Sequence, residues 1–121
     1  AGVLLAFVVM HVGIWLTTRQ MIGHSAPEVA DLLGDRLLPD GKTVLYFYNT
    51  DCSACLLMTP RMERLAKQHP GVVMVNTREE RELSKRLGVS ATPTVIVLHH
   101  GKIAAALVGA QSERRLRKLF R

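Results

Sequence analysis

The sequence predicts a single α/β domain, in which helices flank a mixed β-sheet, preceded by an N-terminal helix that crosses a membrane. Its 121 residues provide one core of ordinary size and leave no room for a second domain. Charged residues make up 21% of the chain, which excludes wholesale disorder, and two cysteines exclude a scaffold built on many disulfides. The fold class itself follows from strand-like runs that alternate with helical segments.

Residues 1–22 are expected to form the membrane anchor. The run 1–16 is apolar throughout except for His11, and the first charged side chain is Arg19. A helix over the whole segment rises roughly 33 Å at ~1.5 Å per residue, enough to cross a hydrocarbon layer of ~30 Å. The alternatives are an uncleaved or mis-assigned signal segment and a buried helix of a soluble protein. His11 is either a contact to a partner helix or tetrapyrrole, or a neutral imidazole tolerated in a single-pass anchor, and the second interpretation is favoured.

Residues 23–42 are expected to form a linker and the first helix of the domain. The run 25–28 (Ser-Ala-Pro-Glu) has the pattern of a capping box with proline in the first turn. It predicts a short helix that ends at Leu33 or Leu38, before a turn at 39–41 (Pro-Asp-Gly).

The remaining segment, residues 43–121, is expected to form the domain proper. Strands are predicted at residues 43–48, 72–75, 94–98 and 103–108. Helices are predicted at residues 52–69, 77–88 and 112–120. The expected N-caps are Thr50 or Asp51 for the first helix, Thr77 in a capping box with Glu80 for the second, and Ser112 for the third. This order of elements gives a mixed sheet with helices packed against it.

Cys52 and Cys55 form a C-x-x-C motif at the point where the first predicted strand is followed by a helix. Free backbone N–H groups and the helix dipole favour a thiolate at the first turn of a helix. We therefore expect Cys52 to be the exposed nucleophile and Cys55 to be the buried thiol that resolves a mixed disulfide. Zinc ribbons and structural cysteine pairs also use this spacing, so the motif alone does not identify a redox site. The surrounding sequence must support that interpretation.

The context resembles the thioredoxin family over about two thirds of the chain. The matching features are the strand motif 45–49 (Leu-Tyr-Phe-Tyr-Asn), Cys52-x-x-Cys55, Pro60, the run 88–94 (Gly-Val-Ser-Ala-Thr-Pro-Thr), Gly101 and Gly109. The resemblance implies a thioredoxin-like fold in which Pro60 lies within the active-site helix. It also implies a cis Thr92–Pro93 bond, a conformation accessible essentially only before proline. Pro93 then faces the cysteine pair, and the backbone of Thr92 pairs with an extended substrate.

The chain departs from the family at positions that bear on function. Tyr46 stands where typical thioredoxins have a buried aspartate, and Met74 replaces the neighbouring lysine, so no charged pair is left to relay protons to Cys55. Asp51 replaces the tryptophan before the first cysteine, and its negative charge opposes thiolate formation. The intervening pair is Ser53 and Ala54 rather than Gly and Pro. These departures favour a dedicated reductase over a strong oxidant.

Neither a metal nor another cofactor is expected. A copper site is one alternative, because thioether, thiolate and imidazole groups suit Cu(I). The residues that would form it are Met58, Met62, Cys52 and His69. The spacing of the apolar residues is more typical of core packing. The predicted packing face of this helix consists of Leu56, Leu57, Met58 and Leu65.

The C-terminal segment 112–121 carries much of the net charge of +6. Its basic residues are Arg114, Arg115, Arg117, Lys118 and Arg121. The segment is interpreted as a terminal helix docked through Leu116, Leu119 and Phe120. The alternative is that this basic segment binds anionic lipid or an acidic partner. Nucleic-acid binding is not expected, because no aromatic stacking platform or reader motif accompanies the charge.

The sequence therefore predicts a membrane-anchored thiol–disulfide oxidoreductase that exchanges disulfides with partner proteins. The domain is expected on the extracytoplasmic side of a single-pass anchor. The alternative is a non-catalytic accessory or assembly subunit of a membrane complex, which keeps the fold and the cysteines while the anchor and the basic tail dock it to other subunits.

Overall fold

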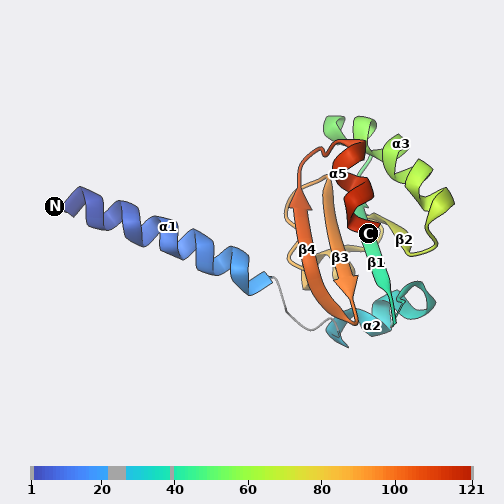
Figure 1. Ribbon diagram of the computed structural model, residues 1–121, viewed down its shortest axis with the longest axis horizontal. Coiled ribbons are helices and arrows are strands. Elements are labelled where there is room, and N and C mark those ends of the chain that lie inside the picture. Colours follow the sequence, from blue (N-terminus) through green and yellow to red (C-terminus); the bar gives the residue numbers. More distant parts are fainter. Residues whose placement is uncertain (1, 22–26, 39, 121) are drawn as a thin grey trace.

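A computed structural model describes residues 2–21, 27–38 and 40–120, with the backbone alone for 13–21, 27 and 28 (Figure 1). The helices are α1 (Gly2–Met21), α2 (Pro27–Leu33), α3 (Ser53–Gln68), α4 (Arg81–Arg86) and α5 (Glu113–Arg117). The 3-10 turns are η1 (Gly34–Arg36) and η2 (Lys118–Phe120). The strands are β1 (Lys42–Tyr48), β2 (Val72–Asn76), β3 (Thr94–His99) and β4 (Lys102–Val108).

The strands form one four-stranded sheet in the order β2-β1-β3-β4. β1 and β2 are parallel because α3 carries the chain back across the sheet between them, whereas β1–β3 and β3–β4 are antiparallel. The β3–β4 hairpin turns at His100 and Gly101, which both have positive φ. The mixed sheet predicted from the sequence is confirmed.

The two faces of the sheet carry separate apolar cores. Because side chains alternate along a strand, β1 sends Leu45 and Phe47 to one face and Val44 and Tyr46 to the other. The first core is completed by residues of α2, of α4 and of the α4 C-cap: Val29, Leu33, Leu83 and Leu87. The second is completed by residues of α3 and α5, which Figure 1 shows together on one face: Met58, Met62, Leu65 and Leu116.

Helix α1 occupies most of the segment in which a membrane anchor was expected. In the described parts of the chain, no helix combines the length and the apolar character needed to cross a bilayer, so the expected anchor is not borne out. The ring of His11 lies 3.9 Å from that of Phe7, centroid to centroid, and its Nδ1 is 2.9 Å from the Phe7 carbonyl oxygen. The imidazole therefore has a partner within its own helix.

The predicted helix ends are partly correct. Ser112 caps α5 by accepting a hydrogen bond from the Arg115 N–H, as expected. The capping box at Thr77 is wrong: α4 begins four residues later and has no side-chain cap. The backbone N–H groups there are taken up by Asn76 instead, whose carbonyl oxygen accepts from Glu79 and Glu80. The predicted capping residues 25 and 26 lie outside the described residues.

The apolar face predicted for α3 also needs correction. Met58 and Leu65 are buried, and so is Met62, which agrees with core packing. Leu56 and Leu57, however, are 74% and 61% exposed. The helical repeat explains the difference, because residues 58, 62 and 65 follow one another on one face, whereas 56 and 57 lie off it.

A pair of hydroxyl groups joins α3 to the sheet below it. Tyr46 of β1 is completely buried, and its hydroxyl lies 2.9 Å from that of Thr59 in α3. Burial raises the pKa of Tyr46, and the hydrogen bond with Thr59 opposes this increase. The ring of Tyr46 also stacks on that of Tyr48, with 5.5 Å between centroids.

The burial of Met62 leads to a prediction on stability. Met62→Ala should lower the free energy of unfolding by about 2–5 kcal/mol, because it leaves a cavity between α3 and the sheet. Leu57→Ala on the exposed side should change it by less than about 0.5 kcal/mol. Urea unfolding of the full chain, followed by circular dichroism, measures both. Equal losses would contradict this packing of α3.

The Tyr46–Thr59 pair predicts a change in alkaline stability. At pH 7, Tyr46→Phe should cost about 1 kcal/mol, because one hydrogen bond is lost. The raised pKa means that tyrosine ionises first in the unfolded chain, so this residue contributes a loss of stability as the pH rises above about 10. The variant should therefore lose less stability than the parent between pH 7 and about pH 10.5 in urea unfolding. The same loss in both proteins would contradict the assignment.

Candidate functional site

The C-x-x-C motif lies where β1 leads into α3, and there Cys52 and Cys55 form a disulfide. Their Cα atoms are 5.2 Å apart, within the range that a disulfide allows. The N-cap of α3 is Cys52, so the predicted caps Thr50 and Asp51 are wrong. The Cys52 Sγ accepts a hydrogen bond from the Cys55 N–H at 3.2 Å. Cys52 is half-buried, whereas Cys55 is only 3% exposed. The predicted roles require this difference, with one accessible sulfur and one protected sulfur.

Helix α3 determines the electrostatics at Cys52. The free N–H groups of its first turn carry a partial positive charge, which stabilises a thiolate at the N-cap once the disulfide is reduced. Ser53 is exposed and Ala54 is half-buried. Both side chains are small, so neither covers the sulfur atoms. Pro60 lies inside α3, where it has no backbone N–H to donate to the turn before it. The arrangement can hold a reactive thiolate and can accept two electrons as a disulfide.

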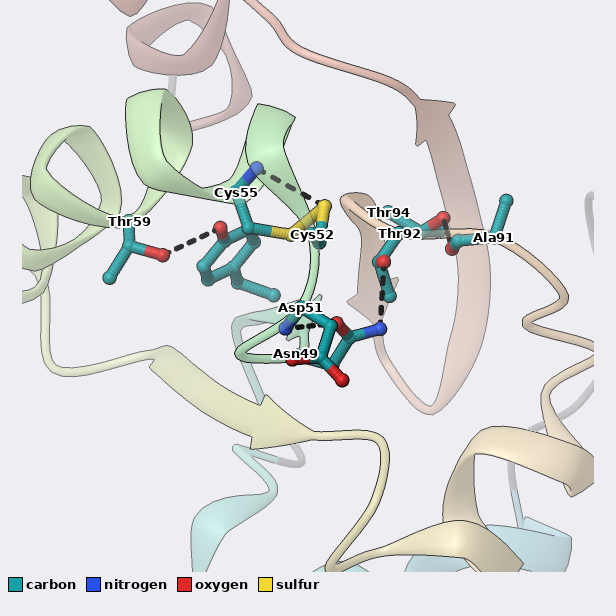
Figure 2. The surroundings of a disulfide bond; sticks show 9 residues. Asn49, Asp51, Cys52, Cys55, Thr59, Ala91, Thr92 and Thr94 are labelled. Carbon is teal, nitrogen blue, oxygen red and sulfur yellow. Dashed lines mark hydrogen bonds between the residues drawn. A yellow bond between two sulfur atoms is a disulfide. The ribbon is translucent and has the colours of Figure 1, made fainter.

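The loop before β3 lies beside the disulfide, and its Thr92–Pro93 bond is cis, as the family resemblance implied. The carbonyl oxygen of Pro93 accepts a hydrogen bond from Gly109 N–H at 2.8 Å. Thr94 donates its hydroxyl to the Ala91 carbonyl oxygen at 2.7 Å, which closes the loop on itself (Figure 2).

Asn49 connects this loop to the cysteine motif, a role that the sequence analysis missed. Its Nδ2 donates to the Thr92 hydroxyl at 3.1 Å, and its Oδ1 accepts from the Asp51 N–H at 2.9 Å (Figure 2). One side chain thus fixes both the turn that leads to Cys52 and the position of Thr92. An asparagine directly after a strand is typical of such a turn, so a local signal was present.

Arg78 is the second residue that the sequence analysis missed. It follows β2, and its guanidinium forms an exposed ion pair with the carboxylate of Asp51. Its backbone N–H donates to the Oδ1 of Asn76 at 3.0 Å, which helps to position it. Because β1 and β2 are parallel, residues that follow their carboxyl ends meet at one edge of the sheet. The negative charge that was expected to oppose the Cys52 thiolate is therefore largely balanced.

Tyr46 and Met74 occupy the positions where the resemblance predicts a charged pair. They are register partners on β1 and β2. Tyr46 makes its hydrogen bond to Thr59, one helical turn beyond Cys55. Among the residues that the structure describes, no three His, Cys, Asp or Glu side chains are grouped so that they could hold a metal ion.

Known proteins match both the sequence and the fold. The Thioredoxin family model matches residues 31–121. A disulfide bond formation protein from Brevibacillus choshinensis is 33% identical over 81 residues, which are 64% of this chain and 69% of that protein. The mitochondrial thioredoxin of Mus musculus is 33% identical over 106 residues, 85% of this chain and 61% of that protein. The chain thus spans less than two thirds of the mouse relative.

Solved structures give the same result for the fold. A mutant thioredoxin from Halobacterium salinarum NRC-1 matches with a TM-score of 0.64 at 28% identity, covering 77% of this chain and 80% of that one. A Schistosoma mansoni thioredoxin matches with a TM-score of 0.65 at 23% identity, covering 78% of this chain and 85% of that one, which supports the fold alone. The family model covers most of the chain, and the sequence motifs and the architecture agree with it. The chain belongs to the thioredoxin family.

Proposed function

We propose that this protein is a thiol–disulfide oxidoreductase that exchanges disulfides with partner proteins through Cys52 and Cys55. The observation that carries the proposal is the unequal exposure of two bonded cysteines at the start of α3, beside a cis-proline loop. The names of the relatives support it, since they include thioredoxins and a disulfide bond formation protein.

The proposed reaction proceeds in two steps from the reduced chain. The Cys52 thiolate attacks one sulfur of a substrate disulfide, forming a mixed disulfide and releasing the other substrate sulfur as a thiolate. The thiolate of Cys55 then attacks Cys52 Sγ, which forms the Cys52–Cys55 disulfide and releases the second substrate thiolate. Two electrons pass from the chain to the substrate, and each released thiolate takes a proton. A dithiol reductant must then restore the pair.

We infer that Pro93 and Thr92 shape the groove for the substrate backbone. Thr92 is tied through Asn49 to the turn that carries Cys52, so an extended segment bonded to Cys52 Sγ lies next to this loop. The balanced charges of Asp51 and Arg78 support use as a reductase, because a strong oxidant requires an unusually stabilised thiolate.

The location and the docking contacts stay predictions from the sequence. The extracytoplasmic placement and contacts with membrane-complex subunits belong to this group. So does binding of the 112–121 segment to anionic lipid. In the structure, Leu116 is buried while Arg114, Arg115, Arg117 and Lys118 are exposed, an arrangement that fits both a docked terminal helix and a basic contact surface.

The first test of the proposal is a trapping experiment. Cys55→Ser removes the resolving thiol, so a mixed disulfide between Cys52 and a substrate protein should persist. Non-reducing electrophoresis of the full chain from its host membranes and soluble fractions, followed by mass spectrometry, should identify a defined set of adducts.

The matched control is the double variant with Cys52→Ser and Cys55→Ser, which should form none. If Cys55→Ser also traps nothing and Cys52→Ala leaves the host phenotype intact, the alternative of a non-catalytic accessory subunit replaces the proposal.

The second test concerns the ion pair beside Cys52. In the Cys55→Ser background, where Cys52 is the single thiol, Arg78→Ala should slow alkylation by iodoacetamide at pH 7 about two- to fivefold. The reason is that Asp51 is left uncompensated near the thiolate. Asp51→Asn should accelerate it by a similar factor. The effects should shrink in about 1 M salt, because the pair is exposed. Shifts of both variants in the same direction would contradict this electrostatic account.

A further inference from the structure

We propose that a cavity beside Cys55 binds one apolar side chain of the protein substrate, next to the substrate cysteine. The inference rests on the proposed function and adds a specificity site to it. The cavity has a volume of about 320 Å³ and a predominantly apolar wall. Residues 48–50 form one part of this wall, and α3 provides the rest through Cys55, Leu56, Thr59 and Pro60.

The size of the cavity limits what it can hold. Pockets for drug-sized molecules occupy roughly 300–1,000 Å³, so this cavity lies at the lower limit. It therefore has room for one large side chain, such as phenylalanine, but is too small for a folded segment. Apolar and aromatic walls with a few polar groups at the rim are typical of such sites, and Asn49, Thr50 and Thr59 are the polar groups here.

The cavity lies close to the point of exchange. Cys55 is in its wall, and the sulfur of Cys55 is bonded to that of Cys52, to which the substrate would be joined. Successive residues of an extended peptide advance by about 3.3–3.6 Å, so a neighbour of the substrate cysteine reaches the wall. Figure 2 shows Thr59 and Thr92 on opposite sides of the disulfide, so this site is separate from the groove at the cis-proline loop.

Leu56 forms an exposed, apolar part of the cavity rim. It is 74% exposed and lies at the end of the first turn of α3, directly after Cys55. Leu57 is similarly exposed, at 61%, but it does not line the cavity. The occupant we propose is a substrate, because a molecule bonded to Cys52 is joined to the residue whose disulfide partner, Cys55, lines the cavity. An inserted apolar side chain covers Leu56 and removes it from water.

The test measures single-turnover exchange with short cysteine peptides. Each peptide is supplied as a mixed disulfide with 2-nitro-5-thiobenzoate, whose acidic thiol is the leaving group, so Cys52 bonds to the peptide sulfur. The release of that thiol is followed by absorbance, using the reduced full chain. Peptides with phenylalanine on either side of the cysteine are compared with peptides that carry serine there. The better phenylalanine peptide should react about tenfold faster than its serine counterpart.

Two variants then locate the effect. Leu56→Ser should remove most of the preference for phenylalanine, measured as the ratio of the rates with the phenylalanine and serine peptides. Leu57→Ser is the matched control and should keep the preference. Both changes are neutral, so neither alters the charge near the Cys52 thiolate.

Several results would overturn the inference. These are equal rates with the phenylalanine and serine peptides, equal effects of the two leucine variants, or a dimer of the parent chain that Leu56→Ser dissociates in light scattering. The last result would identify a second copy as the occupant. No reaction with any peptide would overturn the proposed function itself, and this inference with it.

Discussion

The structure of the site depends on the position of Cys52 at the N-terminus of α3. The Cys55 N–H, at the start of the helix, donates to both the sulfur and the carbonyl oxygen of Cys52, and this contact holds the two cysteines together. The same geometry leaves Cys52 half-buried and Cys55 covered. Any change that moved the start of α3 by one residue would separate the sulfur from these N–H groups. The burial of Met58, Met62 and Leu65 opposes such a change, because it fixes the rotation of the helix on the sheet.

Asn49 extends this arrangement to the other half of the site. Cys52 follows β1 and Thr92 precedes β3, and these two strands are antiparallel neighbours. The end of one strand and the start of the next therefore lie together, and a single side chain spans both segments. In the proposed reaction, a substrate bonded to Cys52 would meet a loop that Asn49 already holds in position. Order of this kind reduces the conformational entropy lost on binding.

Most of the fold could be predicted from the sequence because local patterns determine it. The apolar runs of all four strands, the cap at Ser112 and the C-x-x-C motif after a strand are read from neighbouring residues. Two predictions from the sequence were wrong for local reasons, one on a helix cap and one on core residues. The Glu80 N–H assigned to a Thr77 capping box donates to the Asn76 carbonyl oxygen instead. Leu56 and Leu57 were assigned to the core although they lie off the helical repeat. The Asp51–Arg78 pair joins residues from two loops, and only the parallel pairing of β1 and β2 places them together.

At the positions where the chain departs from the family pattern, the charged groups near the cysteines lie on the surface and not in the core. In the core, Tyr46 and Met74 are neutral, and burial raises the pKa of Tyr46, so this position stays uncharged at physiological pH. On the surface, Asp51 and Arg78 lie beside Cys52 as exposed opposite charges. Surface charges interact through a high dielectric and are screened by salt, whereas a buried charge is not. We therefore expect the reactivity of Cys52 to depend on ionic strength. We also expect it to depend on the charges of a partner that approaches this edge of the sheet.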